Sequence, residues 1–219
     1  GFIMDNRRKL ELVKEATKRK LLTQYQTNFE QFAKQQIKII TKDASKGFVP
    51  FIFNEAQQKV NEALEQQLKE KGRVRALILK ARQQGISTHV GGYFYFGASQ
   101  RKAQKCMVVT HSADSTRALF DMTKRYHENC PQLLKPHTKY SSRKELSFDV
   151  LDSSYVVATA GSEAIGRGET LTHVHASELA FWSPSTAKEN WNALLQAVPN
   201  EKGTAIIAES TANGLSNIF

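Results

Sequence analysis

The chain has 219 residues, 40% of them hydrophobic, which is enough to bury a core within one large domain. No apolar run is long enough for a membrane span, and no signal-peptide pattern is present. The two cysteines make neither a disulfide framework nor a zinc site. This low cysteine count favours a reducing interior. The net charge of +10 favours an anionic partner.

Residues 1–47 are predicted to form a basic helical segment. They hold 11 Lys or Arg and 5 Asp or Glu, so +6 of the net charge lies there. Apolar residues recur at helical spacing from 29 to 40. The basic side chains either form a solvated helix face or contact nucleic acid or a partner protein. We assign 48–219 to a second unit, which starts with an apolar extended segment at 48–53 that we expect to be buried.

A helix is expected between Asn54 and Gly72. Asn54 is a good N-terminal cap, and Gly72 stands where a left-handed residue ends a helix. Gln57 leaves two interpretations open. Gln57 or Gln58 could recognise an adenine edge, because an amide offers both a donor and an acceptor, and Asn54-x-x-Gln57 is also a capping box.

The next segment resembles a phosphate-binding loop. An apolar strand, 74–79, runs into a basic turn that contains a glycine, and a predicted helix follows. Such loops point backbone N–H groups at phosphates, supply a cation, and bring a hydroxyl to Mg²⁺. Against the pattern G-x-x-x-x-G-K-[ST], Gly85 and Ser87 are in register, but Ile86 replaces the lysine and Lys80 the first glycine. A basic turn between a strand and a helix is the alternative.

The remaining elements alternate between strands and helices. We expect helices through 93–96, at 113–129 and at 188–197, strands at 105–110, 171–176 and 205–208, and an antiparallel pair at 145–148 and 155–158. This order predicts an α/β fold, a mainly parallel sheet with helices on both faces. Ligands of such sheets bind beyond the carboxyl ends of the strands.

Three strands should therefore present polar residues at one edge. They are followed by the loop from Lys80, by Ser177 and Glu178, and by a polar run from Glu209 to Gly214. Glu178 suits the carboxylate that orients water for hydrolysis of a phosphoanhydride. His173 and His175 should point to one face, and we favour a structural role for them because no third metal ligand is evident.

These residues carry a resemblance to the ATPase domain of large terminase subunits, the DNA-packaging motors of tailed bacteriophages. It covers about 48–214 and rests on the loop 80–88, on 166–170 ahead of 175–182, and on 209–214. The resemblance implies a P-loop NTPase fold of ASCE type, ATP and Mg²⁺ as ligands, and double-stranded DNA as the substrate that is moved. It also implies a small terminase subunit and a portal protein as partners, with a ring of subunits when assembled, a monomer in isolation, and no membrane. The location implied is the host cell cytoplasm, docked on the portal of a procapsid.

By position, the resemblance assigns a role to each site residue. The Walker A, nucleotide-binding loop is Lys80, Ala81, Arg82, Gln83, Gln84, Gly85, Ile86, Ser87 and Thr88. Glu178 is the catalytic Walker B glutamate, Arg167 an arginine finger that acts on a neighbouring subunit, and Gln57 the adenine-side glutamine. Ser210, Thr211 and Ala212 form the coupling motif. Ser87 and Ser177 lie on the Mg²⁺ side, although Ser177 stands where many ATPases have an aspartate.

Ile86 cannot carry charge, so Lys80 or Arg82 must neutralise the γ-phosphate. We favour Lys80 for contact with the phosphate and give Arg82 a part in turnover. We expect Ile86→Lys to be tolerated without large gain.

Family members also carry a metal-dependent nuclease domain, which needs clustered carboxylates. No acid follows Glu209, so we expect no nuclease activity from this chain. Two other functions remain open: a helicase-like nucleic-acid translocase, and a non-catalytic, nucleotide-sensing assembly protein.

Overall fold

The computed structural model describes residues 5–81, 84–142, 144–162, 165 and 168–211. None of the described helices is long and apolar enough to cross a membrane. The helices are α1 (Asn6–Tyr25), α2 (Phe29–Gln36), α3 (Glu55–Lys71), α4 (Ile86–Gln100), α5 (Ala113–Glu128) and α6 (Ala187–Ala197), with 3-10 turns η1 (Ala44–Lys46) and η3 (Leu179–Phe181). The strands are β1 (Lys38–Ile40), β2 (Phe48–Pro50), β3 (Val74–Lys80), β4 (Lys105–Thr110), β5 (Lys139–Ser142), β6 (Glu145–Phe148), β7 (Ser153–Thr159), β8 (His173–Ser177) and β9 (Ala205–Thr211).

The main sheet of the described chain has seven strands in the order β3-β9-β8-β4-β7-β6-β5. The first five are parallel, whereas β6 and β5 extend the sheet as antiparallel strands. β9 thus lies between the strand before the loop and the strand before Glu178, which agrees with the predicted ASCE type. β9 is longer than expected and continues to Thr211, so Glu209 and Ser210 belong to the strand itself.

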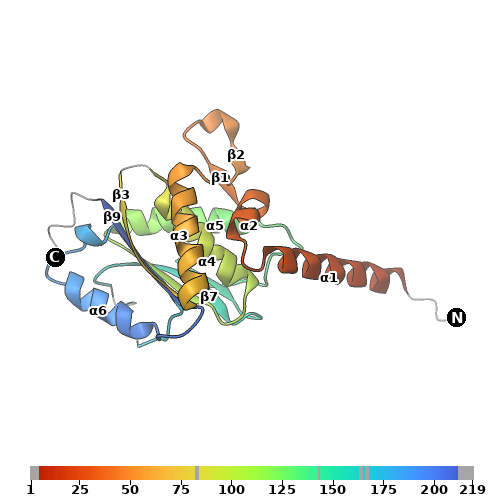
Figure 1. Cartoon of the computed structure of the whole chain (residues 1–219). Coiled ribbons are helices and arrows are strands. Elements are labelled where there is room, and N and C mark those ends of the chain that lie inside the picture. The colour runs from red at the N-terminus through yellow and green to blue at the C-terminus, as the bar shows by residue number, and fades with distance from the viewer. Residues whose placement is uncertain (1–4, 82–83, 143, 163–164, 166–167, 212–219) are drawn as a thin grey trace.

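Helices cover both faces of the sheet, as predicted (Figure 1). Alternate residues of β4 face opposite sides: Cys106 and Val108 join the core beneath α3, α4 and α5, and Met107 and Val109 join the core on the side of α6. Both faces of the central strands are therefore buried, which explains why these strands read as continuous apolar runs.

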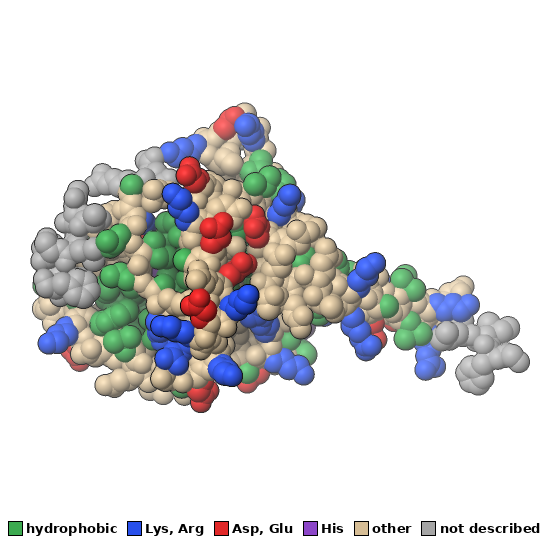
Figure 2. Space-filling model, viewed as in Figure 1, with side chains coloured by type: hydrophobic (Ala, Val, Ile, Leu, Met, Phe, Trp, Pro, Cys, Tyr) green, Lys and Arg blue, Asp and Glu red, His purple; other side chains and the backbone are tan. Residues whose placement is uncertain are grey.

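The N-terminal helices differ in how they attach. α1 projects from the body (Figure 1), and Figure 2 shows Lys, Arg and hydrophobic side chains along it. Leu10, Leu12 and Val13 of this helix are exposed. α2 packs on α4 through Phe29 and Phe32, both of which stack on Phe96.

The apolar segment 48–53 is only partly buried, which corrects the sequence prediction. Phe51 is buried, but Phe48 and Ile52 are 51% and 65% exposed. The reason is that β2 pairs only with the short strand β1 in a separate ribbon, so that neither face of this ribbon is covered along its whole length.

Candidate active site at the carboxyl edge of the sheet

The loop after β3 enters α4 through a glycine that no other residue could replace without strain. Gly85 is the N-cap of α4, with φ +71°, in the left-handed region that favours glycine. A Cβ at Gly85 would lie 2.6 Å from the Gln57 Nε2 atom. No side chain among the described residues caps α4, and the first N–H groups of a helix lack intrahelical partners.

The start of α3 holds this loop in place. The Gln57 Oε1 atom accepts from the Asn54 backbone N–H, and the Asn54 side chain accepts from the Gln57 N–H, so the capping box is present. Gln57 Nε2 also donates to the Gly85 carbonyl at 2.9 Å, and Asn54 Nδ2 donates to the Gln84 carbonyl at 3.1 Å. These bonds use one Nε2 hydrogen and one Oε1 lone pair of Gln57, whose amide has two of each.

Lys80, the last residue of β3, contacts two carboxylates, that of Glu178 directly after β8 and that of Glu209 within β9. Its ammonium lies 3.0 Å from Glu178 Oε1 and 2.8 Å from Glu209 Oε2. Burial acts to lower the Lys80 pKa, but charge and hydrogen bonds from Glu209 and Glu178 outweigh it and raise the pKa. Lys80 therefore remains a cation at this edge.

Glu209 lies at the centre of the cluster and is wholly buried. Its Oε1 accepts from Ser177 Oγ at 2.7 Å and from Ser87 Oγ at 3.2 Å, and lies 3.3 Å from His175 Nε2. Burial acts to raise the Glu209 pKa, but the hydrogen bond and charge of His175 and the charge of Lys80 lower it to about 2. Glu209 is therefore a buried but ionised carboxylate.

Sequence reasoning gave no role to Glu209. The signal was available, because an acid directly after the apolar run 205–208 is as unusual as Glu178 after β8. Its proximity to Ser177 could not be read from the sequence, since it depends on the pairing of β8 with β9.

Glu178 has the features of a strained functional residue. Its φ of 49° lies in the left-handed region, which is uncommon for a residue with a side chain and costs about 1–3 kcal/mol. The following turn stabilises this conformation, because the Trp182 indole donates to the Ser177 carbonyl at 3.0 Å. The Glu178 Oε2 atom is buried and has no hydrogen-bond partner among the described residues. One oxygen is thus held by Lys80 while the other remains available.

The other predicted loop residues divide into three groups. Within the loop, the Ala81 N–H donates a hydrogen bond to Gln84 Oε1 at 3.1 Å. The Thr88 carbonyl accepts one from the Tyr126 hydroxyl. Ile86 is 2% exposed and belongs to the core beneath α4, so its side chain points away from the edge. Two residues of the loop, Arg82 and Gln83, lie outside the described part of the chain. The same holds for two predicted site residues elsewhere, Arg167 and Ala212.

The predicted coupling residues follow Glu209 directly. Ser210 is buried, and its hydroxyl has no hydrogen-bond partner among the described residues, whereas Thr211 is half-buried. Thr211 pairs in register with Lys80 of β3. The predicted coupling segment therefore follows Glu209 along the chain and pairs with Lys80 on the neighbouring strand.

The histidines of β8 point to one face, as predicted. His173 and His175 pack edge-on against Phe94 of α4, with ring centroids 5.3 and 6.3 Å apart, respectively. The described residues contain no group of three His, Cys, Asp or Glu side chains that could hold a metal ion. His175 also orients Glu209, which the sequence did not predict.

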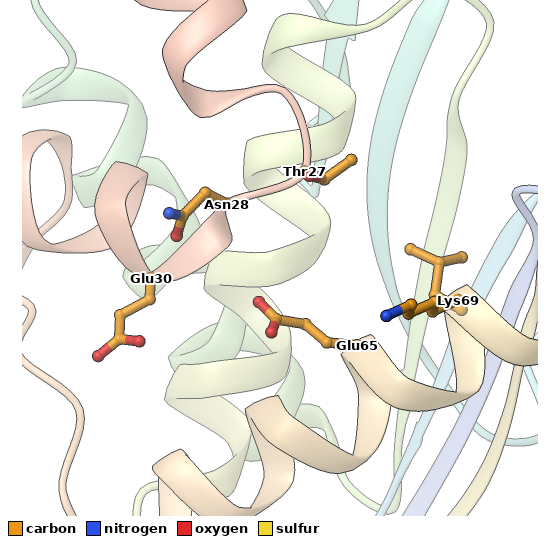
Figure 3. Close-up of a pocket in the computed structure, with 6 residues that line it drawn as sticks. Thr27, Asn28, Glu30, Glu65 and Lys69 are labelled. Carbon is orange, nitrogen blue, oxygen red and sulfur yellow. The ribbon is translucent and has the colours of Figure 1, made fainter.

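One cavity, of about 610 Å³, lies away from this edge. Figure 3 shows it between the start of α2 and the C-terminal half of α3, lined in part by Glu30, Glu65 and Lys69. Gln57 contacts the loop from the opposite end of α3. The cavity is therefore not part of the cluster.

The sequence matches no family model and no curated protein. Among solved structures, the chain is similar to the large terminase of bacteriophage HK97, with a TM-score of 0.67 and 13% identity over 83% of this chain and 36% of that one. It is also similar to the large terminase of a thermophilic bacteriophage in complex with ADP, with a TM-score of 0.51 and 14% identity over 73% and 38%. The chain spans little more than a third of either protein. Its fold is that of phage large terminases, which confirms the predicted fold.

Proposed function

We propose that this chain is the ATP-hydrolysing motor domain of a terminase large subunit, which drives double-stranded DNA into a procapsid. The observation that carries the proposal is the meeting of Lys80, Ser87, Glu178 and Glu209 at the carboxyl edge of a sheet with the terminase fold. One cation, two carboxylates and a hydroxyl at a helix N-terminus are the groups that transfer of a phosphoryl group to water requires.

The proposal gives a role to Lys80, Ser87 and Glu178. Lys80 contacts the β- and γ-phosphates, and the N–H groups at the start of α4 bind phosphate oxygens. Glu178 orients the attacking water and takes up its proton, since its second oxygen is available. Ser87 and Ser177 would lie on the side of a bound Mg²⁺, which would supply neutralisation of the phosphate charge.

The remaining assignments combine described residues with three that lie outside the described chain, namely Arg82, Arg167 and Ala212. Ser210, Thr211 and Ala212 couple hydrolysis to movement, and Gln57 lies on the adenine side. Arg82 assists turnover, and Arg167 acts across a ring of subunits. The partners are double-stranded DNA, the portal protein and the small terminase subunit. We place the assembled motor in the host cell cytoplasm, on the procapsid portal.

The test is to compare Glu178→Gln with the parent for ATP binding and single-turnover hydrolysis. Binding is expected to persist, and the rate to fall by about two to four orders of magnitude, because the amide cannot take a proton. Glu201→Gln, the same change at an exposed position, is the matched control and should leave both values unchanged.

Three outcomes would contradict the proposal. Equal hydrolysis by the Glu178→Gln variant would remove Glu178 from the mechanism. ATP binding without hydrolysis by the portal-bound parent would favour a nucleotide sensor. Strand unwinding would favour a helicase-like translocase.

A further inference from the structure

The pairing of β8 with β9 places Ser177 directly opposite Glu209. Ser177 is the position at which many ATPases carry an aspartate beside Mg²⁺, as the family resemblance implies. We infer that Glu209 takes over the task of that aspartate from the neighbouring strand and holds the hydration shell of the Mg²⁺ that accompanies the nucleotide. The inference rests on the proposed function and names a residue to which that function gave no role.

The hydroxyl groups on the Mg²⁺ side support this assignment. Ser87 from α4 and Ser177 from β8 both donate to the same atom, Glu209 Oε1, at 3.2 and 2.7 Å. Two hydroxyls that come from different elements thus converge on one carboxylate oxygen. An aspartate at 177 would bring its charge to the same place, so a carboxylate on β9 makes an acid on β8 unnecessary.

The chemistry of the cluster fits a hard divalent cation. Mg²⁺ prefers oxygen ligands and is held by one or two carboxylates together with phosphates and waters, not by a cage made only of protein groups. This explains why the described residues provide an oxygen-rich edge without a cluster of three metal-ligating side chains. Two carboxylates, Glu178 and Glu209, lie beside the ammonium of Lys80 and provide oxygen atoms of the kind that Mg²⁺ prefers.

Lys80 provides the link to nucleotide binding. It lies 2.8 Å from Glu209 Oε2, the oxygen that the two serines do not use. A phosphate that binds Lys80 competes with Glu209 for the ammonium. Glu209 would then offer Oε2 to the waters around the metal ion, while Ser87, Ser177 and His175 keep its other oxygen in place.

The test measures metal affinity and does not depend on turnover. ADP binding by the parent is measured first by calorimetry. Mn²⁺, which takes the same oxygen ligands as Mg²⁺, is then titrated into the ADP complex and followed by electron paramagnetic resonance. Glu209→Gln should weaken Mn²⁺ binding by about 10- to 100-fold, the range typical when a group that orients the metal shell is lost.

Glu201→Gln is the matched control, because it makes the same change at an exposed position outside the edge. It should change Mn²⁺ affinity by less than about threefold, because salt screens exposed charges. A double variant, Ser177→Asp with Glu209→Gln, returns the carboxylate to β8 and should recover about tenfold of the loss.

Thermal unfolding shows whether Glu209→Gln still folds. If it does not, Glu209→Asp keeps the charge but withdraws the carboxylate, and Mn²⁺ affinity should still fall about tenfold. An unchanged affinity in the folded Glu209 variant, or an equal loss in Glu201→Gln, would overturn the inference and leave the proposed function standing. A parent that binds no ADP would overturn both.

Discussion

The side chain of Ile86 contributes to the core and supplies no charge to the edge. Its side chain is 2% exposed and belongs to the core beneath α4, while the cation of the edge comes from Lys80 at the other end of the loop. The loop thus assigns helix packing and positive charge to two different positions. The first residue of α4 anchors the helix, and the last residue of β3 carries the charge.

This burial changes the expectation for Ile86→Lys, which the sequence alone predicted to be tolerated. Lysine here would place an ammonium among apolar side chains, at a cost of several kcal/mol. We expect a large drop in the denaturant midpoint of unfolding. Ile86→Val, the control, should cost only about 0.5–1.5 kcal/mol. A midpoint equal to that of the parent would show that the lysine reaches solvent.

The two N-terminal helices show how differently neighbouring elements can be stabilised. Tyr25, at the end of α1, is buried, donates to Gln35 Oε1, and packs edge-on against Phe32. The rest of α1 is exposed or half-buried, and an isolated helix of about 20 residues is marginally stable in water. α1 therefore depends on its own hydrogen bonds, whereas α2 depends on the core.

Hydrogen exchange should separate these helices. Amides of 6–20 are expected to exchange nearly as fast as in an unfolded chain, and those of α2 far more slowly. A chain that lacks 1–20 should keep its melting temperature within about 2 °C. Tyr25→Ala, in contrast, should lower the free energy of unfolding by about 3 kcal/mol, because it opens a cavity in the core. Strong protection of 6–20 would show that α1 packs against something in solution.

Across the whole molecule, buried histidines should couple stability to pH. His89 and His173 are buried, and burial lowers the pKa of each from 6.5 to about 3. The rings of Phe29, Phe51 and Phe53 surround His89, and neither ring nitrogen has a hydrogen-bond partner among the described residues. The folded state therefore keeps these histidines neutral.

The sign of the effect follows from this difference in pKa. Between about pH 6.5 and 3, these histidines bind protons in the unfolded chain but not in the folded chain. Their contribution to the free energy of unfolding is therefore fully present above pH 6.5 and is lost as the pH falls below it. Between pH 7 and 5, the free energy of unfolding of His89→Leu should fall by about 2 kcal/mol less than that of the parent. Denaturant unfolding at each pH measures both values. Equal losses in both proteins would show that His89 is protonated in the folded state.

The sequence by itself determined the order and type of most elements and the edge at which the polar residues meet. Hydrophobic periodicity and the caps at Asn54 and Gly72 are local signals, and parallel strands must bring their carboxyl ends together. This sufficed to predict that Lys80 and Glu178 lie on the same edge.

Only the tertiary structure decided which side chains touch. The pairing of Ser177 with Glu209 depends on register between strands whose partners are distant in sequence. The bond from Gln57 to Gly85 joins two helices, and the inward direction of Ile86 follows from how α4 rotates against the core. Register and helix rotation minimise the free energy of the whole packed core, so no local pattern encodes them.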